Sequence, residues 1–211
     1  VAVVIPCFRV RSHILSVLAR MSDRVEMVYV VDDQCPEGTG KLVETNCRDR
    51  RIKVIFNSVN QGVGGATMAG YRRALADGAD IVVKLDGDGQ MDPALIPRLI
   101  APLERGVADY SKGNRFHCLE NLEGMHLCRK LGNTGLSFFT KIASGYWNVM
   151  DPTNGFTAIH SVALSMLPLS KIEKRYFFES DMLFRLNTIR AVVRDVDHEP
   201  GSHTDRPSVR E

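Results

Sequence analysis

Two aspartates separated by a single glycine, Asp86 and Asp88, follow an apolar run and are themselves followed by Gly89 and Gln90. Two carboxylates this close repel each other unless a cation lies between them. Oxygen ligands favour a hard divalent ion, and Mg²⁺ in particular binds few carboxylates together with the phosphates of a substrate. A solvated Asp-Gly turn is the alternative. Because the pair directly follows a predicted buried strand, we favour a metal site.

A second acidic pair, Asp32 and Asp33, ends another apolar run. Ionised carboxylates only accept hydrogen bonds, so this pair could bind a ribose or a nucleobase. The same residues could instead cap a turn that leads into the next helix. On its own the pair is a weak signal, and its meaning depends on whether it lies near the first pair.

A glycine-rich run, Asn60-Gln61-Gly62-Val63-Gly64-Gly65-Ala66, is similar to the fingerprint of nicotinamide-dependent dehydrogenases. In those proteins the glycines follow the first strand, where a helix N-terminus meets a pyrophosphate. Here the first predicted strand leads into Pro6-Cys7-Phe8-Arg9, and the glycines follow the third. The order of elements therefore argues against a dehydrogenase.

Apolar runs alternate with helical spacings through the first half of the chain. Strands are predicted at 1–5, 25–31, 52–56, 81–85 and 108–112, and helices at 14–21, 41–47, 66–76 and 92–103, with a loop at 57–65. The second half predicts a helix at 127–144, a loop and strand at 151–160, a helix at 177–190 and a strand at 191–196. This order predicts an α/β fold, a single domain with a mostly parallel sheet and helices on both faces. Such sheets bind ligands beyond the carboxyl ends of their strands, where both acidic pairs would meet.

The composition fits a globular domain of 211 residues, 44 % of them apolar and 25 % charged. A net charge of +2 excludes a strongly basic protein, so we expect no nucleic-acid partner. No apolar run approaches the ~18–20 residues of a membrane span, and we expect no signal peptide. The five scattered cysteines match no zinc spacing, which predicts free thiols in a reducing compartment.

Several segments, in their order and spacing, resemble family 2 glycosyltransferases of the GT-A (Rossmann-like) fold. They are Val4-Ile5-Pro6, Val30-Val31-Asp32-Asp33, the glycine-rich run and Lys84-Leu85-Asp86-Gly87-Asp88-Gly89-Gln90. Three later segments are similar to the branch of dolichol-phosphate mannose synthase and bacterial polyprenyl-phosphate glycosyltransferases: Lys112-Gly113-Asn114-Arg115-Phe116, Arg129-Lys130-Leu131-Gly132-Asn133 and Asp151-Pro152-Thr153-Asn154-Gly155-Phe156. The resemblance covers the chain to about residue 187.

The resemblance implies a metal-dependent, inverting hexosyltransferase. It would move a sugar from a nucleotide-diphosphate sugar (UDP- or GDP-) to a polyprenyl (dolichyl or undecaprenyl) phosphate, with Mg²⁺ or Mn²⁺ as cofactor. The metal would lie among Asp86, Asp88 and Gln90. The nucleotide would contact Pro6, Phe8, Asp32, Asp33, Gly62, Gly64 and Asp86. The acceptor phosphate would be held by Arg115, Arg129 and Asn133, since a guanidinium pairs well with phosphate oxygens.

Two other functions stay open. A related enzyme could transfer to a sugar hydroxyl in cell-surface polysaccharide synthesis, with Asp181 or Asp151 as base. Asp181 and its neighbour Glu179 could instead cap their helix or pair with Arg175 or Arg185. A catalytically silent nucleotide-sugar-binding module is the alternative from another class, and the intact Asp-Gly-Asp motif argues against it.

The lipid acceptor implies a membrane surface as partner and a location at the cytoplasmic face of a membrane. Aromatic residues at 136–139 and 145–147 gather around Lys141 and could lie at a bilayer interface or pack in the core. The branch usually continues into C-terminal membrane helices, which we expect after residue 211. We assign residues 1–197 to the catalytic domain and 198–211 to a loose tail. The turn Gln34-Cys35-Pro36-Glu37-Gly38 departs from the serine-rich turn of many family members.

Overall fold

The computed structural model describes residues 1–114, 145–147, 149 and 154–197. Arg115, Arg129, Asn133 and Asp151, like the expected helix at 127–144 and the tail, lie outside the described residues. The strands are β1 Ala2–Cys7, β2 Met27–Asp32, β3 Ile52–Phe56, β4 Ile81–Lys84, β5 Tyr110–Asn114, β6 Thr157–His160 and β7 Val193–Asp197. The helices are α1 Ile14–Ala19, α2 Thr39–Asn46, α3 Gly62–Ala76, the 3₁₀ turn Pro93–Leu95, α4 Ile96–Glu104, α6 Ser161–Met166 and α7 Phe178–Thr188.

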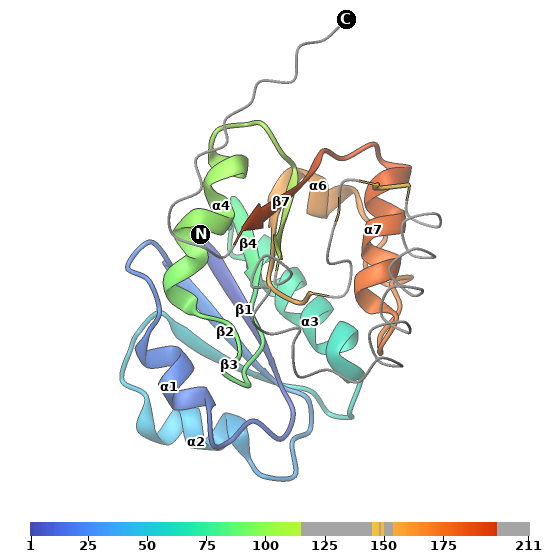
Figure 1. Cartoon of the computed structure of the whole chain (residues 1–211). Helices are drawn as coiled ribbons and strands as arrows, with labels where there is room; N and C mark the ends of the chain where they lie inside the picture. Colours follow the sequence, from blue (N-terminus) through green and yellow to red (C-terminus); the bar gives the residue numbers. More distant parts are fainter. Residues whose placement is uncertain (115–144, 148, 150–153, 198–211) are drawn as a thin grey trace, which may run out of the picture.

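The strands form one sheet in the order β3-β2-β1-β4-β6-β5-β7 (Figure 1). Strands β3, β2, β1 and β4 are parallel to one another, and β5 is parallel to β7. Only β6 of the described strands runs antiparallel, between β4 and β5. The prediction of a mostly parallel α/β sheet in a single domain is therefore confirmed.

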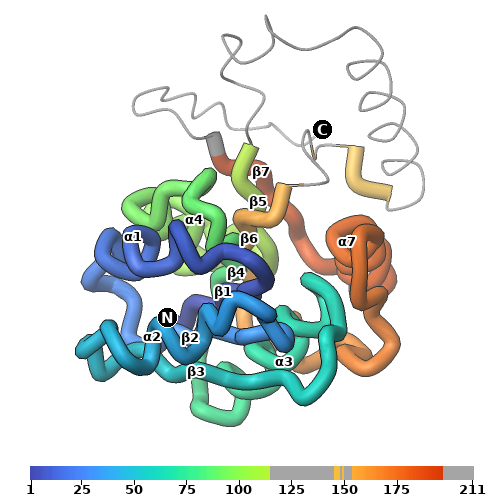
Figure 2. The backbone as a smooth tube through the Cα atoms, turned by 90° about the horizontal axis from the view of Figure 1, so that it is seen from below, coloured from blue at the N-terminus to red at the C-terminus, as the bar shows by residue number. Residues whose placement is uncertain are grey.

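Alternating residues of the central strands bury their side chains on opposite faces of the sheet, as the strand period requires. On one face Val4 and Val31 pack with residues of α3, α6 and α7. On the other, Val3 and Ile5 pack with residues of α1, α2 and α4. Figure 2 shows α1 and α4 on the opposite side of the strands from α3 and α7. Helices thus cover both faces, and the ends of the strands remain for a site.

Strand β1 continues through Pro6 to Cys7, two residues beyond the predicted end. Its pairing with β4 stops at Val4, while its pairing with β2 goes on to Cys7. One side of β1 therefore has no partner strand at Pro6, and a residue without an N–H is tolerated there. Shifts of a few residues affect several other elements: β2, β5 and β7 each begin two residues later than predicted, α2 begins two residues earlier, and α1 ends at Ala19.

The loop predicted at 57–65 is wrong in its second half, because α3 begins at Gly62 and includes the glycines. Glycine disfavours helix by about 1 kcal/mol relative to alanine. Tertiary contacts override that preference here. The backbone N–H groups of Gly62 and Gly64 are hydrogen-bonded to Asp33 and to the Lys174 carbonyl, respectively.

Candidate active site

A cavity of about 330 Å³ opens at the carboxyl ends of β1, β2 and β4. Both predicted acidic pairs contribute to it, through Asp33 on one side and Asp86 with Asp88 on the other. It is lined by Pro6, Cys7, Phe8, Val10, Asp33, Asn60, Gly62, Val63, Ala66, Asp86, Gly87, Asp88, Arg175 and Tyr176. The expectation that the two strand ends meet at one edge is therefore confirmed.

Asp86 and Asp88 are half-buried and have different partners. Asp86 Oδ1 accepts from the Lys84 ammonium at 2.8 Å, whereas Asp88 Oδ1 accepts from the Gln90 backbone N–H at 3.0 Å. Gly87 between them packs closely, since an added Cβ would come within 3.3 Å of Cys7 Sγ. Gln90 is exposed and does not line the cavity.

The chemistry of these donors fits a divalent cation. Two carboxylates reach the same cavity, and hard cations such as Mg²⁺ and Mn²⁺ take oxygen ligands. Within the described ranges no cluster of three or more His, Cys, Asp or Glu side chains forms a closed cage. The remaining ligands of a cation at Asp86 and Asp88 would therefore come from water, from the Gln90 amide or from substrate phosphates.

Asp32 has the turn-capping role that was the alternative for it. Its side chain is buried, and its two oxygens accept from the backbone N–H groups of Cys35 at 2.7 Å and Gly40 at 2.6 Å. It does not line the cavity. These bonds fix the turn at 34–38 and the start of α2. Asp32 therefore stabilises the backbone next to the cavity without lining it.

Asp33 lines the cavity and also holds the N-terminus of α3. Its carboxylate accepts from Asn57 Nδ2 at 2.7 Å, from Gln61 N at 2.9 Å and from Gly62 N at 2.7 Å. A carboxylate at a helix N-terminus satisfies N–H groups that have no partner within the helix, and its charge interacts favourably with the helix dipole. Asp33 therefore joins the second strand end to the glycine-rich helix.

Four backbone N–H groups at the start of α3 bond within the protein and are not free to bind an external phosphate. The Gly64 and Gly65 N–H groups donate to the Lys174 carbonyl at 2.8 and 3.2 Å, and Asp33 takes those of Gln61 and Gly62. Dehydrogenases need these donors for pyrophosphate. The structure thus gives a second argument against that class. Gly62 lines the cavity, whereas Gly64 serves close packing, because a Cβ on it would overlap the carbonyl of Glu173.

The segment that bonds to α3 also brings Arg175 and Tyr176 to the cavity. Arg175 is the one cation among the described lining residues, which also include three carboxylates. Sequence reasoning considered Arg175 only as an ion-pair partner and did not consider Tyr176 or Val10 for the site. No motif marks these residues, since their position depends on the contact between 173–175 and α3.

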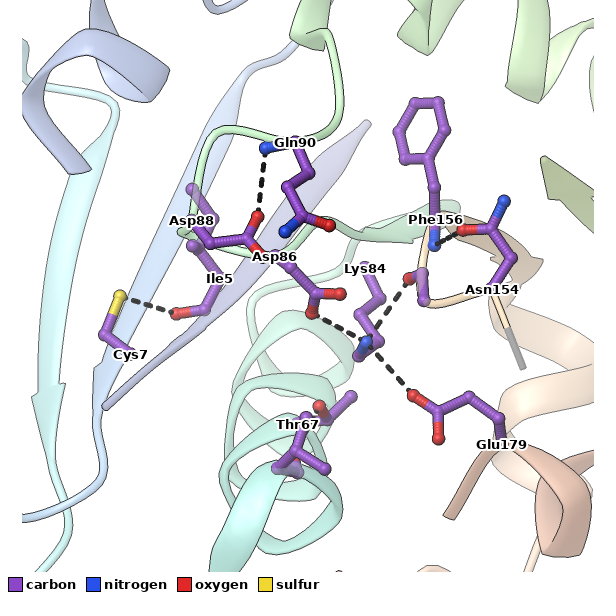
Figure 3. A network of polar contacts seen from close by, with 12 residues as sticks. Ile5, Cys7, Thr67, Lys84, Asp86, Asp88, Gln90, Asn154, Phe156 and Glu179 are labelled. Atoms are coloured by element: carbon purple, nitrogen blue, oxygen red, sulfur yellow. Dashed lines mark hydrogen bonds and ion pairs between the residues drawn. The ribbon is translucent and has the colours of Figure 1, made fainter. Parts of the chain in front are cut away.

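A buried lysine lies directly behind the Asp86 carboxylate (Figure 3). The Lys84 ammonium contacts Asp86 Oδ1 at 2.8 Å, the Gly155 carbonyl at 3.3 Å and Glu179 Oε1 at 3.4 Å. Burial by itself would lower the pKa of Lys84, but the charges of Asp86 and Glu179 outweigh it and raise that pKa. Asp86 and Glu179 therefore favour the protonated form of Lys84, a residue to which sequence reasoning gave no role.

Asp181, one of the two candidate bases, is occupied elsewhere. Its Oδ2 accepts from Arg185 Nε at 3.0 Å and from the Glu173 backbone N–H at 2.8 Å, and it does not line the cavity. This is the ion pair that was the alternative for it. The other candidate base, Asp151, lies outside the described residues, as do the expected acceptor residues Arg115, Arg129 and Asn133.

The described segment that ends at Asn114 and the one that begins at Asn154 are hydrogen-bonded to each other. Asn154 Nδ2 donates to the Gly113 carbonyl at 2.6 Å, and the Lys112 ammonium donates to the Asn154 carbonyl. Of the aromatic residues near Lys141, Tyr146 donates to the Ala191 carbonyl at 2.6 Å, while Trp147 is 61 % exposed.

Among the described helices, none has both the length and the apolar character needed to cross a bilayer. Cys7, Cys35 and Cys47 are free thiols, as expected. The remaining two cysteines lie outside the described residues.

The sequence of this chain is similar to those of known glycosyltransferases. The sequence model of Glycosyl transferase family 2 matches residues 2–166. The undecaprenyl-phosphate mannosyltransferase of Micrococcus luteus is 33 % identical over 189 residues, covering 88 % of this chain and 76 % of the relative. The UDP-N-acetylglucosamine–dolichyl-phosphate N-acetylglucosaminyltransferase of Methanococcus voltae is 30 % identical over 187 residues, covering 82 % and 74 %.

Among solved structures, glucosyl-3-phosphoglycerate synthase from Mycobacterium tuberculosis superposes with a TM-score of 0.67 at 22 % identity, covering 98 % of this chain and 73 % of that one. The structure has the GT-A fold of glycosyltransferases. The chain belongs to glycosyl transferase family 2.

Proposed function

We propose that this enzyme transfers a sugar from a nucleotide-diphosphate sugar to a polyprenyl phosphate, with inversion at the anomeric carbon and with a divalent cation. The observation that carries the proposal is the cavity at the strand ends, which is lined by Asp33, Asp86 and Asp88 together with Arg175. The names of the two relatives described above add support for the acceptor, because both are transferases to a polyprenyl phosphate.

The donor would occupy this cavity. Pro6, Phe8 and Asp33 would contact the nucleoside, and Asp86 and Asp88 would hold the cation. When bound, the cation supplies positive charge to the departing diphosphate. Glucosyl-3-phosphoglycerate synthase from Mycobacterium tuberculosis has been solved with Mn²⁺ and UDP, which supports a similar arrangement here. Arg175 is placed to add a further positive charge for the diphosphate.

In the proposed reaction an oxygen of the acceptor phosphate attacks the anomeric carbon. The new carbon–oxygen bond forms as the bond to the donor diphosphate breaks, so the configuration inverts. A phosphate monoester is largely ionised at neutral pH, with a second pKa of about 6, and needs no strong base. Arg115, Arg129 and Asn133, assigned by resemblance, would orient the acceptor. The enzyme would work at the cytoplasmic face of a membrane, where its lipid acceptor resides.

The ion pair of Asp181 weighs against the alternative acceptor. A hydroxyl acceptor needs a base within hydrogen-bonding reach, and Asp181 instead binds Arg185 outside the cavity. One of the two candidate bases is therefore occupied, and Asp151 lies outside the described residues. We favour the phosphate acceptor, for which no base is required.

The test is transfer of radiolabelled sugar from UDP- and GDP-sugars to a short polyprenyl phosphate, with Mn²⁺ or Mg²⁺ and with chelator as control. We expect a lipid-soluble product that is labile to mild acid and absent with the chelator. Oligosaccharide acceptors are assayed in parallel. Transfer to these, with none to the lipid phosphate, would overturn the proposed acceptor, and full activity in chelator would overturn the metal.

A further inference from the structure

The contacts of Lys84 join three segments that are far apart in the sequence. Lys84 and Asp86 come from the end of β4, Gly155 from the turn before β6 and Glu179 from the first turn of α7. Figure 3 shows the three contacts converging on the Lys84 nitrogen. Because an ammonium has three donor hydrogens, these contacts saturate it, and its side chain is 1 % exposed. Lys84 therefore acts through Asp86 and not on a ligand.

The turn at Gly155 is shaped around this contact. A Cβ at residue 155 would overlap both Asp86 Oδ2 and Lys84 Nζ. The absence of a side chain lets the backbone carbonyl approach the ammonium closely. Within the described part of the chain, Asp86 Oδ2 makes no hydrogen bond and is not a fully buried unpartnered atom. Asp86 is thus held through Oδ1, while Oδ2 accepts no hydrogen bond from a described residue.

The charges of the cluster do not cancel. One ammonium faces two carboxylates, which leaves one negative charge. Asp86 lines the cavity and Glu179 does not. If Lys84 paired with Asp86 alone, the ammonium would neutralise the carboxylate that a cation needs. Glu179 shares the ammonium and thereby leaves negative charge on the cavity side.

A purely structural role explains this arrangement poorly. Removing a lysine and two carboxylates from water is costly, and apolar side chains of similar volume often stabilise a fold as well or better. Lys84 also lies 5.9 Å from the Phe178 ring, beside a core that apolar residues could fill. A buried charge cluster directly behind a ligand-binding carboxylate is suited to orienting that carboxylate.

We propose that Lys84 and Glu179 are positioning residues for the cation site. Lys84 holds Asp86 by Oδ1 so that Oδ2 is presented to a divalent cation, and Glu179 balances Lys84 so that Asp86 keeps its negative charge. This inference rests on the proposed function, since it requires a divalent cation at Asp86 and Asp88. It does not depend on the identity of the acceptor.

The test measures Mn²⁺ binding directly, by electron paramagnetic resonance titration in the presence of UDP or GDP and without any acceptor. Glu179→Gln removes the charge and keeps the size of the side chain. We expect it to weaken Mn²⁺ binding about tenfold to a hundredfold, as for other partners that orient metal ligands. Glu179→Asp keeps the charge and should recover part of the affinity. Lys84→Met should weaken binding as well, and Glu179→Gln keeps the test decisive if Lys84→Met does not fold.

The matched control is Asp77→Asn, which also removes a carboxylate that accepts from a lysine, but at the opposite end of α3. It should lower thermal stability without changing Mn²⁺ affinity. Unchanged Mn²⁺ affinity in folded Glu179→Gln would overturn the proposal. So would an equal loss in Asp77→Asn, or a wild-type enzyme that binds no Mn²⁺ with either nucleotide. If the lipid phosphate is not the acceptor, only the transfer assay fails, and this titration remains interpretable.

Discussion

At the scale of single residues, Asp86 and Asp88 are held differently although only Gly87 separates them. Lys84 fixes Asp86 from behind, whereas Asp88 accepts one backbone N–H, from Gln90, within the described residues. Asp88 is therefore the carboxylate that can reorient around a bound ligand at little cost to the fold.

Asp88→Asn should abolish most transfer and leave the fold intact. The amide keeps the shape of the side chain but removes the charge that a divalent cation requires. We expect activity to fall about a hundredfold, with a change in the free energy of unfolding within about 0.5 kcal/mol, as for other surface substitutions. Sugar transfer and urea unfolding measure the two quantities. Wild-type activity and metal-dependent nucleotide binding in Asp88→Asn would show that the metal assignment is wrong.

Sequence reasoning predicted the residues that follow strand ends better than those that reach the site through long-range contacts. Pro6, Phe8, Asp33, Asp86 and Asp88 all line the cavity. By contrast, 95 residues separate Lys84 from Glu179, and no local pattern relates them. Arg175 was missed for the same reason, because its place depends on the bonds between Lys174 and α3.

At the scale of elements, the first turn of α3 links Asp33, on one side of the cavity, to the segment that precedes α7. Asp33 and the Lys174 carbonyl take its N–H groups, and the close approach requires glycine at 62 and 64. A change in this packing should therefore alter the positions of Arg175 and Tyr176.

Gly64→Ala should destabilise the protein by about 1–3 kcal/mol, the usual cost of overpacking, because its Cβ would overlap the Glu173 carbonyl. It should also weaken nucleotide binding, since it displaces Arg175. Gly78→Ala is the control: residue 78 has a φ of +79° and open space around it, so alanine costs about 1–2 kcal/mol through backbone strain alone. Calorimetric UDP and GDP titrations distinguish the two variants. Equal affinities in both would argue against a link between α3 and the cavity.

At the opposite end of α3, Asp77 makes pH-dependent contacts with two strands of the sheet. Hydrogen bonds from Lys53, Tyr29 and Arg73 lower the pKa of Asp77 well below its usual value. A lowered pKa in the folded state gives stability that is present above the unfolded value of about 3.9 and is lost as the pH falls below it.

The free energy of unfolding of the wild type should therefore fall more steeply than that of Asp77→Asn as the pH is lowered from about 5 to about 2.5. Urea unfolding at a series of pH values measures this difference. Lys53→Met removes one of the three donors and should give an intermediate slope. Parallel curves for the wild type and Asp77→Asn would contradict the assignment.

The elements themselves were predictable to different degrees. Strands β1 to β4 follow from their apolar runs, which are long enough to be recognised without tertiary information. The start of α3 was misplaced because glycine propensity pointed to a loop. The antiparallel direction of β6 had no local signal either, since it is set by pairing with β4 and β5.

At the scale of the whole molecule, the proposed donor cavity is built almost entirely from the first 88 residues, with Arg175 and Tyr176 added by the segment before α7. The residues that resemblance assigns to the acceptor, Arg115, Arg129 and Asn133, belong to a separate stretch of the chain. Donor and acceptor recognition should therefore respond separately to substitution.

Arg129→Ala should reduce transfer to a polyprenyl phosphate about tenfold to a hundredfold, the effect of losing a charge-assisted hydrogen bond of about 1.5–3 kcal/mol. Nucleotide affinity should stay nearly unchanged. Arg129→Lys should recover only part of the activity, because an ammonium cannot pair in a bidentate way. Lys130→Ala is the neighbouring control and should matter less. An equal loss of nucleotide affinity in Arg129→Ala would favour a different acceptor site.

The hydrogen bond from Asn154 Nδ2 to the Gly113 carbonyl has a consequence for which sequence changes the enzyme can tolerate. It holds Gly113 and Asn154 together beside β5, and Tyr146 is bonded to the Ala191 carbonyl, so the closure of the stretch 115–144 depends only weakly on its length. Insertions or deletions within this stretch, or its exchange for the same stretch of a relative, would then leave the proposed donor cavity unchanged. A chimera that carries another enzyme's stretch in place of residues 115–144 should keep its own sugar nucleotide and adopt the foreign acceptor. The acceptor specificity could thus change by recombination while the donor specificity stays the same.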